Sequence, residues 1–370
     1  MSRLKIFGVV NHVGNQYEML KLADYFDVEF TYLENNVRRW SEFSPRPLPK
    51  HLKWATHYEP GKYDLAILHI DQQASDPAIG KGQLYRQLNE QIQDIPKIVI
   101  NHGTPCWDEV YTEDIVINGG EVLGRKGAKQ IDGIKPIVGD NFMVVNSYAA
   151  AQRWGWGFPL IHGMGVDEWW DLPKEPRAVI QLSPAGLDKY YNRQLLSAIK
   201  GYVHEKVGFY PPHIPVDFVP RDWDEQRDFL GRALLYISQT LDSPMPRSRT
   251  EAMLSGSCVL TSRYQDADLY IEHGKNGLIV PDNPISYAET INQLINFNYR
   301  AAVEVGQAGK ETAQKYFNTE RYLKDLWYIV SEVAKGNKPQ WDGSTIYGQK
   351  LWVPENGERL PIGEVTRRAS

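Results

Sequence analysis

Residues 241–282 constrain the fold of this 370-residue chain more than any other stretch. Pro244 and Pro246 hold the beginning of the stretch extended and exclude a helix there. A short helical run follows and ends at Gly256, because glycine suits the backbone conformation of a helix C-terminus. The apolar run 258–260 then predicts a buried strand of a parallel sheet. This order of loop, helix and strand is typical of a doubly wound α/β sheet.

The helix in this stretch carries a carboxylate near its start. Ser248 is predicted to cap the helix, and Glu251, three residues later, completes the pattern of a capping box. Gly274 and Gly277 mark a turn before a further strand at 278–280. Because helix N-termini favour anions, such a place in a doubly wound sheet is suited to phosphorylated ligands.

Length and composition bound the class of protein. A chain of 370 residues is long enough for two domains, each with its own core. The formal charge of −5 argues against broad nucleic-acid binding, so we expect no nucleic-acid partner. The two cysteines, Cys106 and Cys258, indicate no disulfide framework and fit a reducing compartment. No cysteine and histidine cluster has metal-site spacing, so we expect no metal site.

The hydropathy pattern indicates a cytoplasmic protein. The first apolar run, residues 4–10, is too short for a signal peptide, and no stretch approaches the roughly 18 apolar residues of a membrane span. Residues 36–62 are irregular and rich in proline, cationic residues and tryptophan. This segment is either a solvated loop with packed aromatics or a loop that contacts an acceptor or a membrane surface. Peripheral contact with a membrane therefore stays open.

The first half of the chain alternates short apolar runs with loops and helical patterns. Strands are predicted at 5–10, 28–33, 64–69, 97–101 and 143–146, with a first helix over 18–26. No Gly-x-Gly-x-x-Gly or P-loop motif follows a strand, so classical dinucleotide or ATP binding is disfavoured. His102 directly follows a strand and enters a Gly/Pro loop, which puts its imidazole at the crevice of the sheet. The alternative is that His102 hydrogen-bonds only its own loop.

A Gly-rich connector over 162–167 divides the chain into two domains. We expect an N-terminal domain over 1–165, a C-terminal domain over 166–335, and an extended tail over 336–370 that could pack back on the N-terminal domain. Ser147 is predicted to cap a helix that runs through Arg153. In the second domain, strands are predicted at 178–182, 215–219 and 234–238, and helices at 192–205, 223–232, 286–297, 300–316 and 319–334.

Five short motifs stand out between roughly residues 144 and 328: Asn146-Ser147, Gly165-Val166-Asp167, the run 251–256 (EAMLSG), the run 258–262 and the run 274–280. Together with the two α/β domains, these motifs resemble a known family, the GT-B glycosyltransferases. The similarity is to the large retaining group, the glycosyl transferases group 1. The resemblance implies an α/β protein of GT-B class, with two Rossmann-like doubly wound parallel-sheet domains that face a central cleft. The N-terminal domain would bind the acceptor and the C-terminal domain the nucleotide-sugar donor.

The resemblance also implies an activity. It implies a retaining glycosyltransferase that moves a hexosyl group from an NDP-sugar, UDP- or GDP-linked, to a hydroxyl acceptor. The acceptor would be a glycan, a lipid-linked molecule or a small molecule, and neither a cofactor nor an essential metal is expected.

Matching positions imply roles for individual residues. Glu251 would accept hydrogen bonds from the donor ribose, because a carboxylate offers several acceptor sites to neighbouring hydroxyls. Lys189 would neutralise the departing diphosphate, and His102 would lie near the transferred sugar. Gly14 would allow close approach of the backbone to donor or acceptor. The remaining predicted donor contacts are Ser248, Arg249, Arg193, Asp242 and Ser243.

Two positions depart from the family pattern. Ser243 stands where the family commonly has a first glutamate, and its neighbour Asp242 is a shorter acid one position away. Pro184 stands where the family has an arginine, so Arg193, Arg247 or Arg249 would have to supply that charge.

Other functions stay open at this point. A metal-dependent GT-A enzyme would use an Asp-x-Asp motif, which occurs at 222–224 and at 266–268. A GT-B relative with other chemistry, such as a nucleotide-sugar epimerase or a phosphorylase, is a further alternative. The departures at 184 and 243 leave room for a non-catalytic protein that binds a sugar nucleotide or a carbohydrate.

Overall fold

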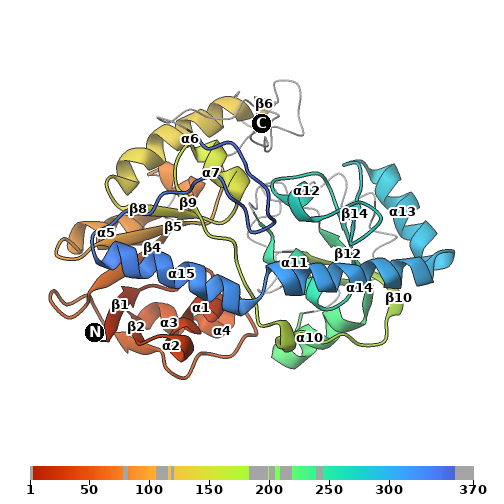
Figure 1. Ribbon diagram of the computed structural model, residues 1–370, viewed down its shortest axis with the longest axis horizontal. Helices are drawn as coiled ribbons and strands as arrows, with labels where there is room; N and C mark the ends of the chain where they lie inside the picture. The colour runs from red at the N-terminus through yellow and green to blue at the C-terminus, as the bar shows by residue number, and fades with distance from the viewer. Residues whose placement is uncertain are drawn as a thin grey trace. The chain divides into compact units, whose positions relative to one another are not determined.

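The computed structural model describes residues 3–77, 82–105, 116–117, 121–182, 199, 205–208, 219–238 and 245–354 (Figure 1). The chain forms two compact units. Unit 1 comprises Met1–Trp40, Leu48–Ile161 and Tyr322–Ser370, and unit 2 comprises Ser41–Pro47 and His162–Arg321.

Unit 1 is built on a seven-stranded sheet in which every pair of neighbours is parallel. Its strands, in spatial order, are β3 (Lys53–Ala55), β2 (Val28–Leu33), β1 (Leu4–Gly8), β4 (Leu65–Ile70), β5 (Lys97–Asn101), β8 (Phe142–Val145) and β9 (Phe158–Pro159). All six residues of β4 are buried, as the continuous apolar run requires of a central parallel strand. The strand order reverses between β1 and β4, which is where doubly wound sheets open a crevice for ligands.

The helices of unit 1 cover this sheet. They are α1 (Val13–Leu20), α2 (Leu22–Tyr25), α3 (Glu34–Val37), α5 (Gln83–Gln91), α6 (Leu123–Val138) and α7 (Tyr148–Trp154), and α4 (Trp40–Phe43) begins in this unit. The predicted cap of α7 is confirmed, because the Ser147 hydroxyl accepts a hydrogen bond from the Ala150 backbone. Gly155 ends that helix in the left-handed conformation.

The C-terminal part of the chain differs from the expected division at residue 335. Helix α15 (Thr319–Ala334) lies along the N-terminal elements in Figure 1, and its apolar face shares one core with β1 and β2. From Tyr322 onward the helix therefore belongs to unit 1. The segment after it continues on the same unit, where Trp341 stacks on Tyr148 with ring centroids 5.6 Å apart.

The segment 36–62 also differs from the expected irregular loop. It contains β3, which pairs in parallel with β2, and residues Ser41–Pro47 belong to unit 2 rather than to unit 1. Trp40 is buried, whereas Trp54 on the edge strand is 55% exposed. An apolar run predicts a strand, and Lys53–Ala55 is too short and too polar to form such a run.

Unit 2 is built on a five-stranded parallel sheet. Its strands, in spatial order, are β11 (Glu205–Gly208), β10 (Glu175–Leu182), β12 (Ala233–Ser238), β13 (Cys258–Thr261) and β14 (Leu278–Ile279). Its helices are α10 (Trp223–Arg232), α11 (Arg247–Leu254), α12 (Ala267–Tyr270), α13 (Pro284–Asn296) and α14 (Tyr299–Tyr316). The predicted helix 223–232 is confirmed at both ends, and Asp222 caps it by accepting from the Glu225 backbone.

Helix α11 ends as predicted but begins differently. Gly256 has φ +74°, and the backbone bonds from Gly256 to Met253 and from Ser257 to Ala252 complete a Schellman turn. The prediction that Ser248 caps the helix is wrong, because Pro246 is the N-cap residue and Ser248 already lies in the first turn. Proline at the cap has fixed φ and extended backbone, so the helix starts two residues earlier than the capping-box pattern indicated.

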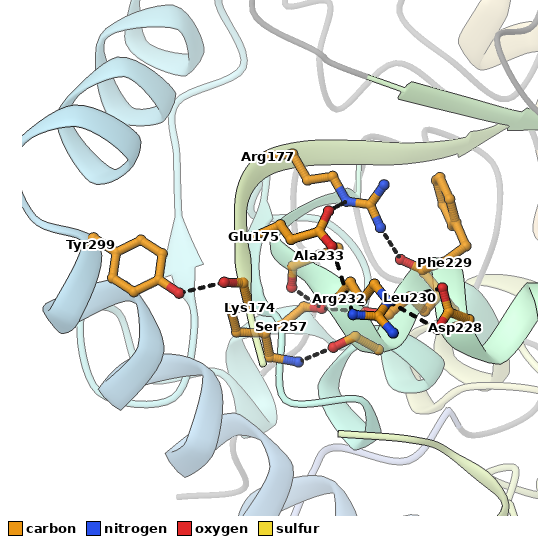
Figure 2. Close-up of polar contacts among 11 residues, drawn as sticks. Lys174, Glu175, Arg177, Asp228, Phe229, Leu230, Arg232, Ala233, Ser257 and Tyr299 are labelled. Carbon is orange, nitrogen blue, oxygen red and sulfur yellow. Dashed lines mark hydrogen bonds and ion pairs between the residues drawn. The ribbon is translucent and has the colours of Figure 1, made fainter. Parts of the chain in front are cut away.

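A polar network fastens the C-terminal end of α11 to the sheet (Figure 2). The Ser257 hydroxyl donates to the carbonyls of Leu230 and Ala233, where α10 passes into β12. Lys174, whose side chain is only 3% exposed, donates from Nζ to the Gly231 carbonyl at 2.7 Å and to the Ser255 carbonyl. These bonds satisfy carbonyls that a helix end leaves without a partner, and they fix the helix that carries Glu251.

Candidate functional site

The carboxyl end of the unit 1 sheet gathers polar side chains from four strands. His69 lies within β4, His102 follows β5, Asn146 follows β8, and His12 and Asn15 lie at the start of α1 after β1. Carboxyl ends of parallel strands meet at one edge, so side chains that are far apart in sequence come together there. We call His12, His69 and His102 the histidine cluster.

His102 contacts residues far outside its own loop. Its Nε2 lies 2.8 Å from Nδ1 of His69, and the two rings stack with centroids 5.1 Å apart. Its Nδ1 lies 3.1 Å from the amide nitrogen of Asn15 and 3.3 Å from that of Asn146. The ring of His12 is 4.8 Å from that of His102. The alternative that His102 bonds only its own loop is therefore wrong.

His69 is held neutral by its surroundings. The side chain is buried, and this desolvation, together with the charge of the nearby His12, lowers the pKa of His69 to about 3. Gln16, also buried, places its amide nitrogen 2.9 Å from His69 Nε2. A neutral imidazole carries one donor and one acceptor, so His69 can hydrogen-bond Gln16 with one ring nitrogen and His102 with the other.

The loop after β5 is held by hydrogen bonds to β5 and to α7. The Asn101 side chain accepts a hydrogen bond from the Gly103 backbone, and the Trp154 indole donates to the Gly103 carbonyl. These contacts explain how a Gly/Pro loop presents the His102 imidazole in one orientation.

Gly14 lies elsewhere than expected. Helix α1 begins at Val13, so Gly14 is in its first turn rather than in a loop before a helix at 18. Val13 is buried and fills the core, and this apolar contact starts the helix five residues earlier than the sequence pattern indicated. A glycine in the first helical turn still exposes its backbone N–H at the helix start.

Glu251 is buried and forms an ion pair within unit 2. It is 4% exposed, and its Oε1 accepts a charge-assisted hydrogen bond from Nη2 of Arg46. In the described part of the chain, Arg46 is the only side chain that hydrogen-bonds to this carboxylate. The second oxygen, Oε2, is therefore the one that a ligand hydroxyl would use without displacing the arginine.

Arg46 is fixed from several sides. Its guanidinium lies 4.7 Å from the ring centre of Trp223 and 5.6 Å from that of Trp169, and Nη1 donates to the Ser44 hydroxyl at 3.3 Å. Aromatic faces attract a guanidinium, and burial strengthens that attraction. The arginine that neutralises Glu251 thus comes from a segment about 200 positions earlier in the chain.

The other described donor candidates on α11 differ in their burial. Arg249 is 1% exposed, and its guanidinium bonds the Thr261 hydroxyl at 3.3 Å and lies 5.4 Å from the Tyr270 ring centre. It therefore packs in the interior of unit 2 beside β13. Ser248 is half-buried in the first turn of the helix.

The connector expected at 162–167 contacts the same helix. His162 Nε2 lies 2.9 Å from the hydroxyl of Thr250, the residue before Glu251. Burial, followed by the charges of Arg247, Arg321 and Arg249, lowers the pKa of His162 well below its usual value. A neutral histidine thus supports the turn of α11 that carries Glu251.

Four predicted site residues lie outside the described residues: Lys189, Arg193, Asp242 and Ser243. Pro184 lies outside them as well. Within the described ranges, no group of three or more histidine, cysteine or acidic side chains could hold a metal ion. No helix in those ranges is both long enough and apolar enough to cross a membrane.

Sequence reasoning missed His12, His69, Gln16 and Arg46 as site residues. The strand-end rule that selected His102 after β5 also applies to β4, where it would have selected His69. No local pattern identifies Arg46, because its partner is 205 positions away.

Comparisons with known proteins agree with this geometry. Residues 210–312, which include α11 and Glu251, match the family model "Glycosyl transferases group 1". Spore coat protein SA of Bacillus subtilis (strain 168) is 26% identical over 146 residues. That match covers 39% of this chain and 38% of the relative, so it spans less than half the length of each protein.

Solved structures show the same fold. Sucrose-phosphate synthase from Thermosynechococcus elongatus aligns with TM-score 0.61 and 13% identity, covering 90% of this chain and 100% of that one. Anabaena HepE in complex with UDP-glucose aligns with TM-score 0.60 and 12% identity, covering 89% and 99%. The chain therefore has the predicted GT-B fold, and residues 210–312 match the group 1 glycosyltransferase model.

This fold excludes the GT-A alternative. One of its two candidate motifs begins with Asp222, which caps α10, and the other begins with Asp266, which is fully buried before α12.

Proposed function

We propose that this GT-B protein, whose residues 210–312 form a group 1 glycosyltransferase domain, transfers a hexosyl group from an NDP-sugar to a hydroxyl acceptor. The observation that carries the proposal is the position of Glu251, a buried carboxylate on the helix that the family model covers. Anabaena HepE, which has the same fold, was solved in complex with UDP-glucose, so UDP is the first nucleotide to test and GDP the second.

In this proposal the donor nucleotide binds to unit 2. Glu251 accepts hydrogen bonds from the ribose through Oε2, while Arg46 keeps Oε1 occupied and holds the carboxylate in one orientation. The first turn of α11 adds backbone N–H groups and the Ser248 hydroxyl near the same ligand. Because its guanidinium lies in the interior, Arg249 supports β13 rather than the diphosphate.

Lys189 is proposed to neutralise the negative charge of the leaving diphosphate, and Arg193 is proposed as a second cation for this role. We propose that these side chains make a bound metal unnecessary. Ser243 and Asp242 lie in the same stretch and are proposed donor contacts of lesser weight, since the family position is normally a glutamate.

The acceptor is proposed to bind to unit 1. His102 would hydrogen-bond the sugar being transferred, and Gly14 would contribute its backbone N–H at the start of α1. The family resemblance implies retention of configuration at the anomeric carbon. Contact of the segment 36–62 with a membrane stays a proposal, for which exposed Trp54 is the suitable side chain.

A direct assay tests this function. The purified chain is incubated with UDP- and GDP-sugars and a panel of sugar, glycerol-phosphate and lipid-linked acceptors, with and without EDTA, and products are identified by mass spectrometry. We expect one donor to give a glycosylated product in EDTA, and NMR of that product to show a retained anomeric configuration. Nucleotide binding without product for any acceptor would favour the non-catalytic alternative.

Glu251→Gln is the matched variant, because it keeps the shape and removes the charge. Glu289→Ala, an exposed glutamate on α13, is the control. Transfer should fall in the first variant and stay at the parent rate in the second. A Glu251→Gln variant that transfers sugar like the parent would refute the assigned role.

A further inference from the structure

We infer that Gln16 and His69 are positioning residues that fix the tautomer of His102, so that its ring presents a protonated Nδ1. The catalytic meaning of this inference rests on the proposed function. The hydrogen-bond chain itself lies wholly within unit 1 and can be tested without any substrate.

The hydrogen-bond chain starts at a backbone N–H group, which can act only as a donor. The His12 backbone N–H lies 2.8 Å from Oε1 of Gln16, and a backbone N–H can only donate. The Gln16 oxygen must therefore face His12, and its amide nitrogen must face the other way. That nitrogen lies 2.9 Å from Nε2 of His69.

This contact determines the proton position on His69. The amide nitrogen of Gln16 can only donate, so Nε2 of His69 accepts and the ring proton sits on Nδ1. The same amide nitrogen also lies 3.5 Å from Nδ1, but that length is at the limit of a hydrogen bond, and the shorter contact decides. Burial keeps the ring neutral at ordinary pH, so only one of its nitrogens is protonated.

The contact with His69 in turn determines the proton position on His102. Nδ1 of His69 lies 2.8 Å from Nε2 of His102, and with its proton on Nδ1 it donates to that atom. Nε2 of His102 is therefore an acceptor, and the proton of the neutral ring is on Nδ1. Nδ1 faces the side-chain amides of Asn15 and Asn146, and at least one of them must turn its oxygen toward this proton.

The consequence concerns the chemistry of His102. With Nε2 occupied by His69, Nδ1 of His102 is a proton donor rather than a lone pair, and a substrate oxygen that displaces the Asn15 or Asn146 amide would accept this proton. A fixed donor can orient a sugar hydroxyl or stabilise an oxygen that gains negative charge during transfer. Reversing the chain would turn the same atom into an acceptor, without moving the imidazole.

Gln16→Glu is the variant that reverses the chain. A carboxylate can accept from both the His12 backbone and Nε2 of His69, so the proton of His69 moves to Nε2 and that of His102 to Nε2 as well. The full-length protein, labelled with ¹⁵N-histidine, is studied by long-range ¹H–¹⁵N NMR, which distinguishes the two tautomers. His69→Gln and His102→Gln identify the two signals, and Gln93→Glu, an exposed site in unit 1, controls for the added charge.

We expect His102 in the parent and in Gln16→Glu to show opposite tautomers, and Gln93→Glu to match the parent. The inference is overturned if parent His102 carries its proton on Nε2, or if Gln16→Glu leaves its tautomer unchanged. Melting temperatures verify folding, and Gln16→Met, which removes the donor without adding charge, should give a mixture of tautomers if Gln16→Glu fails to fold.

Kinetic measurements on Gln16→Glu test whether the hydrogen-bond chain contributes to sugar transfer. Gln16→Glu should lower kcat at least about tenfold with an unchanged Kd for the nucleotide, because the nucleotide is assigned to unit 2 and only the position of a proton in unit 1 is altered. An unchanged kcat with reversed tautomers would overturn the catalytic meaning. If the parent shows the stated tautomers but transfers no sugar, the proposed function fails and the positioning role stands.

Discussion

The two candidate sites are assembled in different ways. The histidine cluster of unit 1 is made by strand ends that converge at the edge of one parallel sheet, so the topology alone brings its members together. The carboxylate of unit 2 depends on one helix and on Arg46, which arrives from a segment about 200 positions earlier. A site made by strand ends can be anticipated from sequence, whereas a site that needs a distant counter-charge cannot.

Removing the carboxylate of unit 2 should have the largest effect. Glu251→Ala leaves Arg46 buried without its ion partner, which should lower the free energy of unfolding by about 3–5 kcal/mol. It should also abolish nucleotide binding, since the ribose acceptor is lost. Chemical denaturation measures the first effect and calorimetric titration with nucleotide the second.

The double variant Arg46→Met with Glu251→Ala separates these two roles. An apolar pair in place of a buried ion pair is often neutral for stability, so most of the lost stability should return while nucleotide binding stays absent. If the double variant binds nucleotide like the parent, Glu251 and Arg46 only support the fold.

Replacing the central residue of the unit 1 cluster should affect transfer but not donor binding. His102→Gln should lower kcat about a hundredfold, in the range for one group that donates or accepts a proton. The nucleotide Kd should stay within error of the parent, because the nucleotide is assigned to unit 2. If His102→Gln also lowers the affinity for nucleotide, the proposal that nucleotide binding depends on unit 2 alone is wrong.

Acid should destabilise each unit through one neutral histidine. The pKa of His69 is about 3 in the folded state, below the value of about 6.5 for an unperturbed histidine, and the pKa of His162 is lowered in the same direction. Below pH 6.5 the unfolded chain binds protons that the folded chain does not, so stability is complete above that pH and falls as pH drops toward 3.

Urea unfolding at pH 7 and pH 5 measures this dependence. His69→Gln and His162→Gln should each make it shallower, one through unit 1 and the other through unit 2. An unchanged pH dependence in either variant would mean that its histidine does not stay neutral in the folded state.

Disrupting the hydrogen bonds of Lys174 at the C-terminal end of α11 should have the smallest effect. Lys174→Met removes the donor to the carbonyls of Gly231 and Ser255 and should cost about 1–3 kcal/mol, seen as a lower melting temperature. Lys275→Met, at an exposed lysine paired with Glu272, is the control and should leave it within about 1 °C of the parent. Equal melting temperatures for the two variants would mean that the network in Figure 2 does not stabilise unit 2.

The sequence predicts the regular parts of this molecule well, for physical reasons that differ by element. Strand 97–101 and helix 223–232 have the predicted bounds because a buried apolar run and an Asp cap are local signals. The GT-B fold is predicted correctly because motif spacing is preserved over residues 251–280, whereas the role of Glu251 in that motif stays a prediction.

The errors come from forces that local patterns do not contain. The capping-box pattern predicts that Ser248 caps α11, but the fixed backbone of Pro246 starts that helix earlier. The sequence pattern places helix 319–334 in the second domain, but the apolar face of α15 packs into the core of unit 1 from Tyr322 onward. Burial of Arg46 against Trp169 and Trp223 follows from tertiary packing alone.

Nucleotide binding in the presence of EDTA tests the central claim most directly. The parent and the double variant Arg46→Met with Glu251→Ala are titrated with UDP, GDP, ADP and their sugar conjugates, and the rise in melting temperature is followed, since a ligand of the folded state raises it. We predict that one nucleotide family, UDP first, stabilises the parent in EDTA and leaves the double variant unchanged. Equal stabilisation of both proteins, or stabilisation of the parent that EDTA abolishes, would contradict a metal-independent donor site built on Glu251.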